Sequence, residues 1–364
     1  MKIAFYGSSL LSSYWNGAAT YYRGVLHELA RRGWDVSFYE PDAFDRQKHR
    51  DIEPPEWAKV TVYSATEEDA RRVIAQAAYA DVVVKASGVG VFDDLLLEGV
   101  GAAADPQAVQ IFWDVDAAAT LDEMRGSVDH PLRRRLPTLD LVMTYGGGPP
   151  VIDAYTGFGA KRCEPIYNAL DPATHFPVEP DDRYAADLNF LANRLPDREA
   201  RVEEFFLKAA AALPERRFLL GGNGWDDKGM PENVRRVGHV GTNDHNAFNT
   251  SSLAVLNVAR DSMAAVGFSP ATRVFEAAGA GACLITDAWE GVEMFLKPDA
   301  EVLVARDGQD VAEHMRALTP QRARAIGTAA RSRILSEHTY ERRGALVDAI
   351  LREEVGRKRR AAVA

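Results

Sequence analysis

The segment from Ser252 to Thr286 contains SLAVLN (Ser252–Asn257), PATRVFEAAGA (Pro270–Ala280) and CLIT (Cys283–Thr286). Two short apolar runs flank a longer stretch in which apolar residues recur at helical spacing, so the expected order is strand, helix, strand. This order is typical of parallel sheets, because parallel strands need a crossover connection that is usually a helix. The segment therefore predicts an α/β fold.

The same alternation of short apolar runs and amphipathic stretches extends over the whole chain. We interpret it as two Rossmann-like domains that face each other across a cleft. In the first half it predicts strands at Lys2–Tyr6, Asp35–Tyr39, Lys59–Tyr63, Asp81–Lys85, Ala108–Trp113, Leu139–Thr144 and Arg162–Tyr167. In the second half it predicts strands at Asp187–Ala192, Arg217–Gly221, Val234–Val237, Ser252–Asn257, Cys283–Thr286 and Glu301–Val304. The expected helices are Thr20–Arg32, Glu67–Ala78, Arg198–Leu213, Asp244–Thr250, Pro270–Ala280, Val311–Leu318, Pro320–Glu337 and Tyr340–Arg357.

The chain has 364 residues, which suggests two domains because domains usually have roughly 100 to 200 residues. A polar segment in the middle contains Pro172, Pro177 and Pro180, which disfavour a helix or a central strand and indicate a hinge. The predicted parts are an N-terminal domain at 1–167, the hinge at 168–185, a C-terminal domain at 186–338, and, at 339–364, a helix that returns to the N-terminal domain and ends in a basic tail.

Charge and composition argue against several classes of protein. Acidic residues outnumber basic ones by 53 to 43, and the net charge of −10 disfavours a protein that binds duplex nucleic acid. The basic run Arg357–Arg360 is expected to be a solvated tail. We expect no signal peptide and no membrane span, and hence a cytoplasmic protein. Cys163 and Cys283 stand far apart without a partner motif, which predicts neither a disulfide nor a zinc site.

The loop after the first predicted strand contains Gly7, Ser8 and Gly17. Glycine at the carboxyl end of a parallel strand lets the backbone approach a ligand, and such folds bind ligands at this edge. Strand-to-helix turns also carry glycine for geometry alone, and both interpretations stay open.

The corresponding turn of the second domain carries two arginines. Arg194 follows a predicted strand, and Arg198 opens the next helix. Two guanidiniums beside a helix N-terminus form a site for a dianionic phosphate. The alternative is that Arg198 pairs on the surface with Glu199 or Glu203.

Two further turns of the second domain end at the same predicted edge. The first is rich in glycine, which suits a tight turn that leaves space for a ligand, although a purely structural turn explains it as well. The second turn supplies Arg260, a third cation at that edge. The candidate residues of these turns are Gly222, Asn223, Gly224 and Trp225 in the first and Asn257 and Arg260 in the second.

The most specific local pattern surrounds the predicted helix at Pro270–Ala280. Ser269 suits the N-cap and Pro270 the first helical position, which leaves the first N–H groups for an anion. Arg273 and Glu276 lie three residues apart on one face. The arginine could meet a phosphate and the carboxylate could accept both ribose hydroxyls. The alternative is an ion pair within the helix.

Two carboxylates are the candidate catalytic residues. Asp114 and Asp116 follow an apolar strand and could orient an acceptor hydroxyl or act as general base. They could equally cap the next helix. His175, His239 and His245 lack the spacing of a metal site, so we expect them to be structural or exposed, and we predict no metal.

Taken together, these residues resemble those of GT-B glycosyltransferases and, within that group, of the CgeB-type spore-maturation glycosyltransferase-like proteins. The hinge Tyr167–Asp171 followed by Phe176 is similar to the Asn-Gly-Val-Asp linker of such enzymes. The resemblance covers most of the chain, and its specific motifs are Asn193-Arg194, Asp197-Arg198-Glu199, Val202–Phe206, Gly221–Trp225, Leu256-Asn257 and the stretch from Arg273 to Asp287.

The resemblance implies a donor nucleotide in the C-terminal domain and an acceptor in the N-terminal domain. It places Glu276 on the ribose, and Arg194, Arg198 and the helix start Ser269–Arg273 around the diphosphate. Two positions depart from the family pattern. Phe268 replaces the first glutamate of the E-x7-E pair, and Trp113 replaces the histidine that often precedes the aspartate.

The function implied is transfer of a sugar from a nucleotide-diphosphate sugar to an unknown acceptor, without metal or other cofactor. The donor and the acceptor are the expected partners, and the sequence gives no indication of oligomeric state. Two alternatives stay open. One is a nucleotide-sugar epimerase, or a phosphorylase with lysine-linked pyridoxal phosphate, of the same fold. The other is a non-catalytic protein that binds a sugar or nucleotide sugar.

Overall fold

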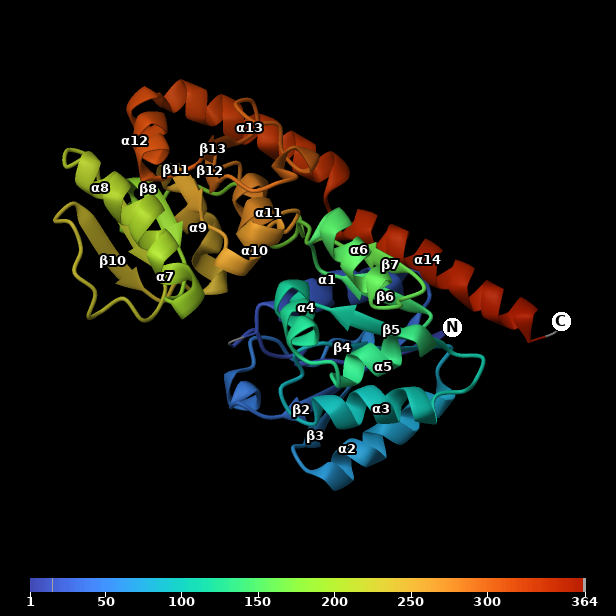
Figure 1. Cartoon of the computed structure of the whole chain (residues 1–364). Helices are drawn as coiled ribbons and strands as arrows, with labels where there is room; N and C mark the ends of the chain where they lie inside the picture. The colour runs from blue at the N-terminus through green and yellow to red at the C-terminus, as the bar shows by residue number, and fades with distance from the viewer. Residues whose placement is uncertain (15, 363–364) are drawn as a thin grey trace. The chain divides into compact units, whose positions relative to one another are not determined.

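The computed structural model describes residues 1–14 and 16–362. The chain divides into two compact units (Figure 1). The first unit consists of Met1–Tyr167 together with Tyr340–Ala364, and the second consists of Asn168–Thr339. The segment predicted to be a hinge thus belongs to the second unit.

The first unit contains a seven-stranded parallel sheet in the order β3-β2-β1-β4-β5-β6-β7. The strand order reverses between β1 and β4, and ligands of such sheets bind outside the carboxyl ends of the strands at this point. The strands are β1 (Lys2–Tyr6), β2 (Asp35–Asp42), β3 (Ala58–Ser64), β4 (Val82–Ala86), β5 (Val109–Asp114), β6 (Leu141–Thr144) and β7 (Cys163–Pro165). The main helices are α1 (Ala18–Arg31), α2 (Glu67–Ile74), α3 (Asp93–Ala103), α4 (Ala117–Gly126), α5 (Pro131–Arg135), α6 (Gly148–Gly157) and α14 (Tyr340–Ala361).

The second unit contains a six-stranded parallel sheet in the order β10-β9-β8-β11-β12-β13, with its reversal between β8 and β11. Its strands are β8 (Ala186–Leu191), β9 (Phe218–Gly221), β10 (Val234–Gly238), β11 (Ser252–Asn257), β12 (Leu284–Asp287) and β13 (Leu303–Ala305). Its main helices are α7 (Pro196–Val202), α8 (Lys208–Ala212), α9 (His245–Thr250), α10 (Asp261–Val266), α11 (Thr272–Gly279), α12 (Gly308–Ala317) and α13 (Pro320–Glu337). The two sheets confirm the predicted α/β class with two Rossmann-like domains.

The helices differ from the prediction more than the strands do. The helix expected at Arg198–Leu213 consists of α7, a π-helical turn η5 (Glu203–Leu207) and α8. The helices α3, α5, α6 and α10 were not predicted, and α4 was expected only as the helix that follows Asp114 and Asp116. Left-handed backbone precedes two of them, at Phe92 before α3 and at Gly147 before α6. Such entries lack the Ser, Thr, Asp or Asn cap on which helix starts are usually recognised.

Buried aromatic rings hold the second sheet to η5, the helical turn between α7 and α8. Phe206 packs against Phe190 and Phe218 with ring centroids 5.5 and 5.6 Å apart. All three rings belong to a continuous buried cluster. Burial of one such side chain stabilises the fold by roughly 1.5–3 kcal/mol. This core fixes the helix starts at the edge where β8 and β11 end.

Helix α14 packs on α1 within the first unit, as the sequence predicts (Figure 1). A Cβ atom at Gly24 would lie 2.4 Å from the Tyr340 ring, and one at Gly344 would lie 2.3 Å from Glu28. The two glycines therefore allow a close approach of the helices. Trp34 Nε1 donates to Asp348 Oδ1 at 2.7 Å and adds a polar contact.

The basic run at the end of α14 is exposed at Arg357, Arg359 and Arg360, as expected of a solvated segment, but it is helical and three of its side chains form ion pairs. Lys358 Nζ lies 2.7 Å from the buried Asp140 carboxylate, and Arg359 lies 2.8 Å from Asp81. Arg357 pairs with Glu354 at 2.6 Å. The carboxylates that pair with these cations belong to the first unit. The basic run therefore adds to the packing of α14 within that unit.

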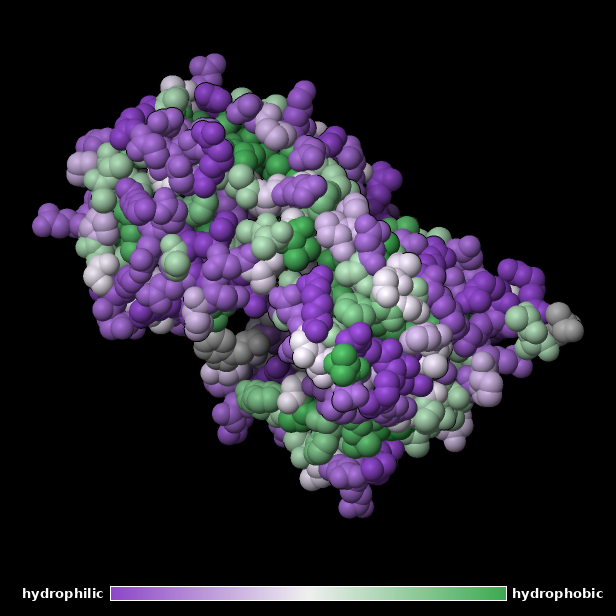
Figure 2. Space-filling model, in the orientation of Figure 1, coloured by the Kyte–Doolittle hydropathy of each residue, from purple (hydrophilic) through white to green (hydrophobic). Residues whose placement is uncertain are grey.

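Among the described residues, no helix combines the length and the apolar composition that crossing a bilayer requires. On the face drawn in Figure 2, hydrophilic residues cover most of the surface and hydrophobic residues gather in smaller groups between them.

Candidate functional site

In the part of the chain that the structure describes, three arginines of the second unit, Arg198, Arg273 and Arg333, have a buried guanidinium nitrogen without a hydrogen-bond partner. Arg333 forms ion pairs with Glu301 and Glu337, which leaves Arg198 and Arg273 as the candidates for binding an anion. Arg198 lies in α7 and Arg273 in the first turn of α11. Neither Arg198 Nε nor Arg273 Nη1 has a hydrogen-bond partner among the described residues. Burial lowers the pKa of Arg198, and the nearby guanidiniums of Arg260 and Arg273 lower it further. Positive charge is thus concentrated beside the carboxyl ends of the strands in the sheet of the second unit.

This arrangement is unfavourable for the protein alone. An arginine remains charged in proteins, so burial cannot neutralise it. A buried charge is costly unless a counter-charge with hydrogen bonds accompanies it. An anion with several oxygen acceptors would satisfy both guanidiniums at once.

Arg194 has a different environment, and here the prediction needs correction. Its Nε and Nη2 donate to both oxygens of Glu199 at 2.8 Å, and Nη1 donates to Asp227 at 2.8 Å. These hydrogen bonds raise the pKa of Arg194. The surface pairing considered for Arg198 is therefore made by Arg194, whose donors are occupied. The environment of Arg260 is intermediate between those of Arg194 and Arg198, because Arg260 Nε donates to Asp197 at 2.5 Å.

The glycines after β9 are required by the conformation of the backbone and by its close approach to β8. Gly222 has φ +114°, and a Cβ atom there would lie 2.1 Å from the Ala192 carbonyl oxygen. Gly224 also has a left-handed φ, of +87°. The turn thus lets β9 pass close to the end of β8. Asn223 is exposed, and its N–H donates to Asn193 Oδ1 at 2.9 Å.

Two residues predicted to contact the donor belong to the interior instead. Trp225 is buried in the core, and its Nε1 donates to the Ala192 carbonyl at 2.7 Å. Asn257 is buried, and its Nδ2 donates to Thr286 Oγ1 at 3.0 Å, which ties β11 to β12. Both side chains hold the sheet edge in place rather than facing a ligand.

The helix carrying Arg273 begins at Thr272, two residues later than predicted, and its N-cap is Ala271. Ser269 is not the cap, because its Oγ donates to the Gly267 carbonyl at 2.8 Å. Phe268 has φ +46°, and its N–H donates to the Glu290 carbonyl at 2.6 Å. These bonds hold the preceding residues out of the helix, and Ala271 supplies no side-chain cap.

Glu276 lies one turn after Arg273, as predicted, with its side chain 12% exposed. It meets two histidines that sequence spacing does not connect: His175 Nε2 lies 3.7 Å from Glu276 Oε1, and one atom each of His175, His245 and Glu276 lie within 4.8 Å of one another. The sequence analysis gave no reason to expect His175 and His245 to lie together beside Glu276. His239 is exposed, as expected.

The charges of this cluster are set by burial and by Arg273. Burial opposes ionisation of Glu276, but His175, His245 and Arg273 outweigh it and lower the pKa of Glu276. Burial lowers the pKa of His245 to about 4, so this imidazole is neutral at pH 7. A carboxylate, two imidazoles and a guanidinium thus lie at the start of α11.

In the first unit, Asp114 does not fit the role of general base. Its carboxylate is fully buried and accepts hydrogen bonds from Ser87 Oγ at 2.8 Å, from the Asp116 N–H at 2.9 Å, from Thr120 Oγ1 at 3.1 Å and from the Tyr155 hydroxyl. Burial raises the pKa of Asp114. Asp114 therefore orders the turn between β5 and α4.

Asp116 remains the candidate base, because it is half-buried at the start of α4 and its side chain does not cap that helix. Trp113, at the position of the family histidine, is buried, and its Nε1 donates to the Tyr21 hydroxyl at 3.0 Å. The indole therefore does not replace the histidine as a sugar contact.

The N-terminal loop is held from within the first unit. A Cβ atom at Gly7 would lie 2.7 Å from the Phe38 ring, and Ser8 Oγ donates to Asn16 Oδ1 at 3.0 Å. Gly17 is exposed with open space around it. The buried Glu40, which was not predicted, accepts hydrogen bonds from the Leu10 N–H and from Ser9 Oγ. A glutamate within the apolar strand β2 was the available signal.

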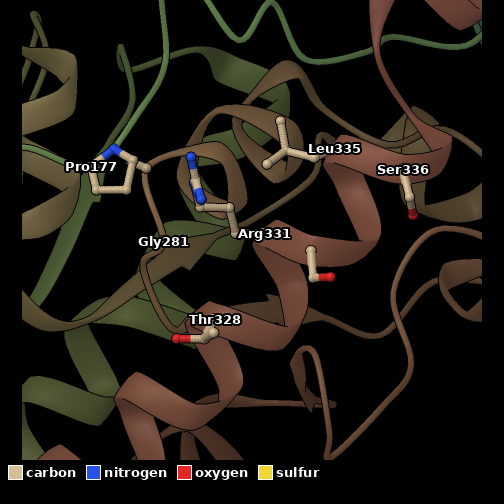
Figure 3. A pocket seen from close by; sticks show the side chains of 8 residues that line it. Pro177, Gly281, Thr328, Arg331, Leu335 and Ser336 are labelled. Carbon is tan, nitrogen blue, oxygen red and sulfur yellow. The ribbon is translucent and has the colours of Figure 1, made fainter.

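A shallow groove of about 640 Å³ lies at the opposite end of α11 (Figure 3). It is lined by Pro177, Gly281 and one face of α13, including Arg331. Arg331 Nε donates to the Gly279 carbonyl at 3.2 Å. Since α11 separates this groove from Arg273 by two turns, it does not belong to the candidate site.

Residues 198–351 match a sequence family described as "Glycosyl transferase-like". None of the curated proteins matches this sequence. Among solved structures, sucrose-phosphate synthase of Thermosynechococcus elongatus is 14% identical, with a TM-score of 0.69 over 97% of this chain and 98% of that chain. Anabaena HepE in complex with UDP-glucose is 13% identical, with a TM-score of 0.71 over 97% and 100%. The glucosyltransferase of phage T4 in complex with UDP-glucose is 12% identical, with a TM-score of 0.53 over 99% of both chains.

The family match confirms the prediction of a glycosyltransferase, and the structural neighbours confirm the predicted two-domain fold. Arg198 and Arg273, which have the unpartnered nitrogens, both lie inside the matched region. The chain therefore has the GT-B fold, and its residues 198–351 carry the sequence pattern of the glycosyl transferase-like family.

Proposed function

We propose that this protein transfers a sugar from a nucleotide-diphosphate sugar, which binds to the second unit at the starts of α7 and α11. The observation that carries the proposal is the pair of guanidiniums of Arg198 and Arg273, each with a buried nitrogen that has no partner. A diphosphate offers two anionic groups and many acceptor oxygens. The α11 N-terminus adds a favourable dipole for the same anion.

The ribose would bind one turn further along α11. Three residues of helix correspond to a rise of about 4.5 Å, which suits the step from a phosphate to a sugar hydroxyl. Glu276 is ionised at neutral pH, and a carboxylate can accept hydrogen bonds from both ribose hydroxyls. Arg273 and Glu276 would thus fix the orientation of the donor.

The arginines also have a role in the chemistry. In the transfer, the bond between the anomeric carbon and the diphosphate oxygen breaks, and a bond to an acceptor oxygen forms. Negative charge develops on the leaving diphosphate, where Arg198 and Arg273 would stabilise it. We therefore propose transfer without a divalent cation, with Asp116 as the base that accepts the proton of the acceptor.

UDP-glucose is the first donor to test, because the HepE and phage T4 structures that resemble this chain contain it. The narrower resemblance to CgeB-type proteins rests on the motifs from Asn193 to Asp287 and stays a proposal. The cytoplasmic location and the roles of the two domains, donor and acceptor, also stay predictions.

Calorimetric titration of UDP and UDP-glucose in a buffer with chelator tests the donor site. We expect Arg198→Ala and Arg273→Ala each to weaken binding roughly 10- to 100-fold, since a hydrogen bond to a charged group contributes about 1.5–3 kcal/mol. Arg194→Ala is the matched control, because its carboxylate partners leave it no role at the diphosphate. Wild-type affinity in folded Arg198→Ala and Arg273→Ala variants would disprove the proposed site.

Incubation with UDP-glucose then separates the alternative functions. A transferase releases UDP in proportion to glycosylated acceptor. An epimerase interconverts the donor without acceptor, and a binding protein leaves it intact.

A further inference from the structure

We propose that His175, His245 and Glu276 form a binding site for a divalent transition metal of the Zn²⁺ type. The three side chains come from different parts of the second unit: the segment before β8, the first residue of α9, and α11. One potential ligand atom from each lies within 4.8 Å of the other two. This site is not needed for the sugar transfer proposed above.

The ligand atoms converge without other partners. His175 Nε2 and His245 Nδ1 are buried and have no hydrogen-bond partner among the described residues. His175 Nε2 lies 3.7 Å from Glu276 Oε1. In a tetrahedral site with bonds of roughly 2.0–2.1 Å, ligand atoms are about 3.4 Å apart. A small inward movement of the side chains would therefore complete the coordination.

The opposite edge of the His175 imidazole is held as that of a metal-bound histidine usually is. Thr174 Oγ1 lies 2.9 Å from His175 Nδ1. Such outer hydrogen bonds fix the tautomer and turn the other ring nitrogen toward the metal.

The ligand set selects the class of ion. Imidazole suits zinc, copper, nickel and iron, whereas calcium and magnesium prefer oxygen ligands. Three protein ligands leave a fourth position open for water. The positive charge of Arg273, one turn before Glu276, repels the metal ion and weakens its binding. We therefore expect an exchangeable ion rather than a permanent structural one.

The metal site shares Glu276 with the proposed donor site. This sharing predicts competition between metal and donor, a prediction that rests on the proposed function. A carboxylate that ligates a metal cannot accept both ribose hydroxyls at the same time. Metal and donor should therefore exclude each other, and each should weaken the binding of the other by the same factor.

Titration of the chelator-treated, tag-free full chain with Co²⁺ and Zn²⁺ tests the metal site. We expect saturable binding of one Co²⁺, with the visible absorption of a tetrahedral complex, and its displacement by Zn²⁺. His175→Gln and His245→Gln should each weaken binding at least tenfold, in line with the loss of one ligand. His239→Gln is the matched control, because this histidine is exposed and outside the cluster. Thermal unfolding curves establish that the variants are folded.

Absence of saturable binding, or equal binding by folded His175→Gln, His245→Gln and wild type, would overturn the proposal. A second titration follows UDP with and without Zn²⁺. We expect Zn²⁺ to weaken UDP binding to wild type more than to His245→Gln, which corrects for Zn²⁺ bound by UDP itself. Since donor affinity is also measured with chelator, failure of the metal site and failure of the donor site give different results.

Discussion

Arg194 and Arg198 are four residues apart in the sequence, and their surroundings give them different roles. Arg194 is paired with Glu199 and Asp227, whereas Arg198 has a buried nitrogen without a partner. The sequence shows two arginines and several carboxylates but not which of them pair. The side chain that remains unpaired becomes visible only when the path of the turn after β8 is known.

Asp114 and Asp116 also have different roles, structural for Asp114 and catalytic for Asp116. Loss of the Asp114 carboxylate leaves its buried donors unsatisfied, each at a cost of about 1–3 kcal/mol. We expect Asp114→Ala to lower the free energy of unfolding by at least about 2 kcal/mol, measured by urea denaturation. Asp114→Ala with wild-type stability would contradict the structural role given to this carboxylate.

Asp116→Ala should instead change the reaction. We expect little change in unfolding free energy and a decrease in kcat of roughly 10²- to 10⁴-fold, the usual contribution of a general base. The measurement is the initial rate of UDP release with a saturating acceptor. A variant that transfers sugar at the wild-type rate would remove Asp116 from the mechanism.

Among the elements, the strands were the most predictable. The apolar runs of the central strands are buried on both faces of a parallel sheet, so their pattern is continuous, whereas the edge strands β3 and β10 are partly exposed. The start of α11 was not predictable, because Ser269-Pro270 has the composition of a helix start. The backbone bond from Phe268 to Glu290, 22 residues later, holds this segment outside the helix. The cluster of His175, His245 and Glu276 was missed for a similar reason, since a contact between distant residues leaves no spacing in the sequence.

The contact between α1 and α14 depends on two glycines. We expect Gly24→Ala to lower the free energy of unfolding by about 1–3 kcal/mol, the usual cost of overpacking, because the new methyl group would overlap the Tyr340 ring. Gly126→Ala is the control, since a Cβ atom there has open space. Equal stability of the two variants in denaturant titrations would show that the helices are not in close contact.

The N-terminal loop should respond to pH through Asp51, whose carboxylate accepts hydrogen bonds from the N–H and the Oγ of Ser13 at 3.0 and 2.9 Å. Burial opposes its ionisation, but the hydrogen bonds and charge of Arg23 outweigh this and lower the pKa of Asp51. Its contribution is therefore present above the unfolded pKa of about 4 and is lost as pH falls through the lower folded value. We expect Asp51→Asn to cost about 1 kcal/mol at pH 7 and progressively less in acid. A cost that is constant from neutral to acidic pH would contradict this assignment.

At the scale of the whole molecule, the chain leaves the first unit after Tyr167 and returns to it at Tyr340. The helix expected to return to the first domain is α14, which packs on α1. We expect deletion of 340–364 to destabilise the first unit, since α1 would lose its cover. Deletion of 362–364 is the control. Circular dichroism during heating measures both, and an unchanged transition in the longer deletion would contradict the division into units.

The central claim is that Arg198 and Arg273 hold the diphosphate of a nucleotide donor. The most direct test compares the dissociation constants of UDP and UMP for the wild type and for the double variant Arg198→Ala, Arg273→Ala, in chelator. We predict that the wild type prefers UDP by at least roughly tenfold, as expected for charge-assisted hydrogen bonds to the second phosphate. The double variant should lose most of this preference. An unchanged preference in a folded double variant would contradict the account.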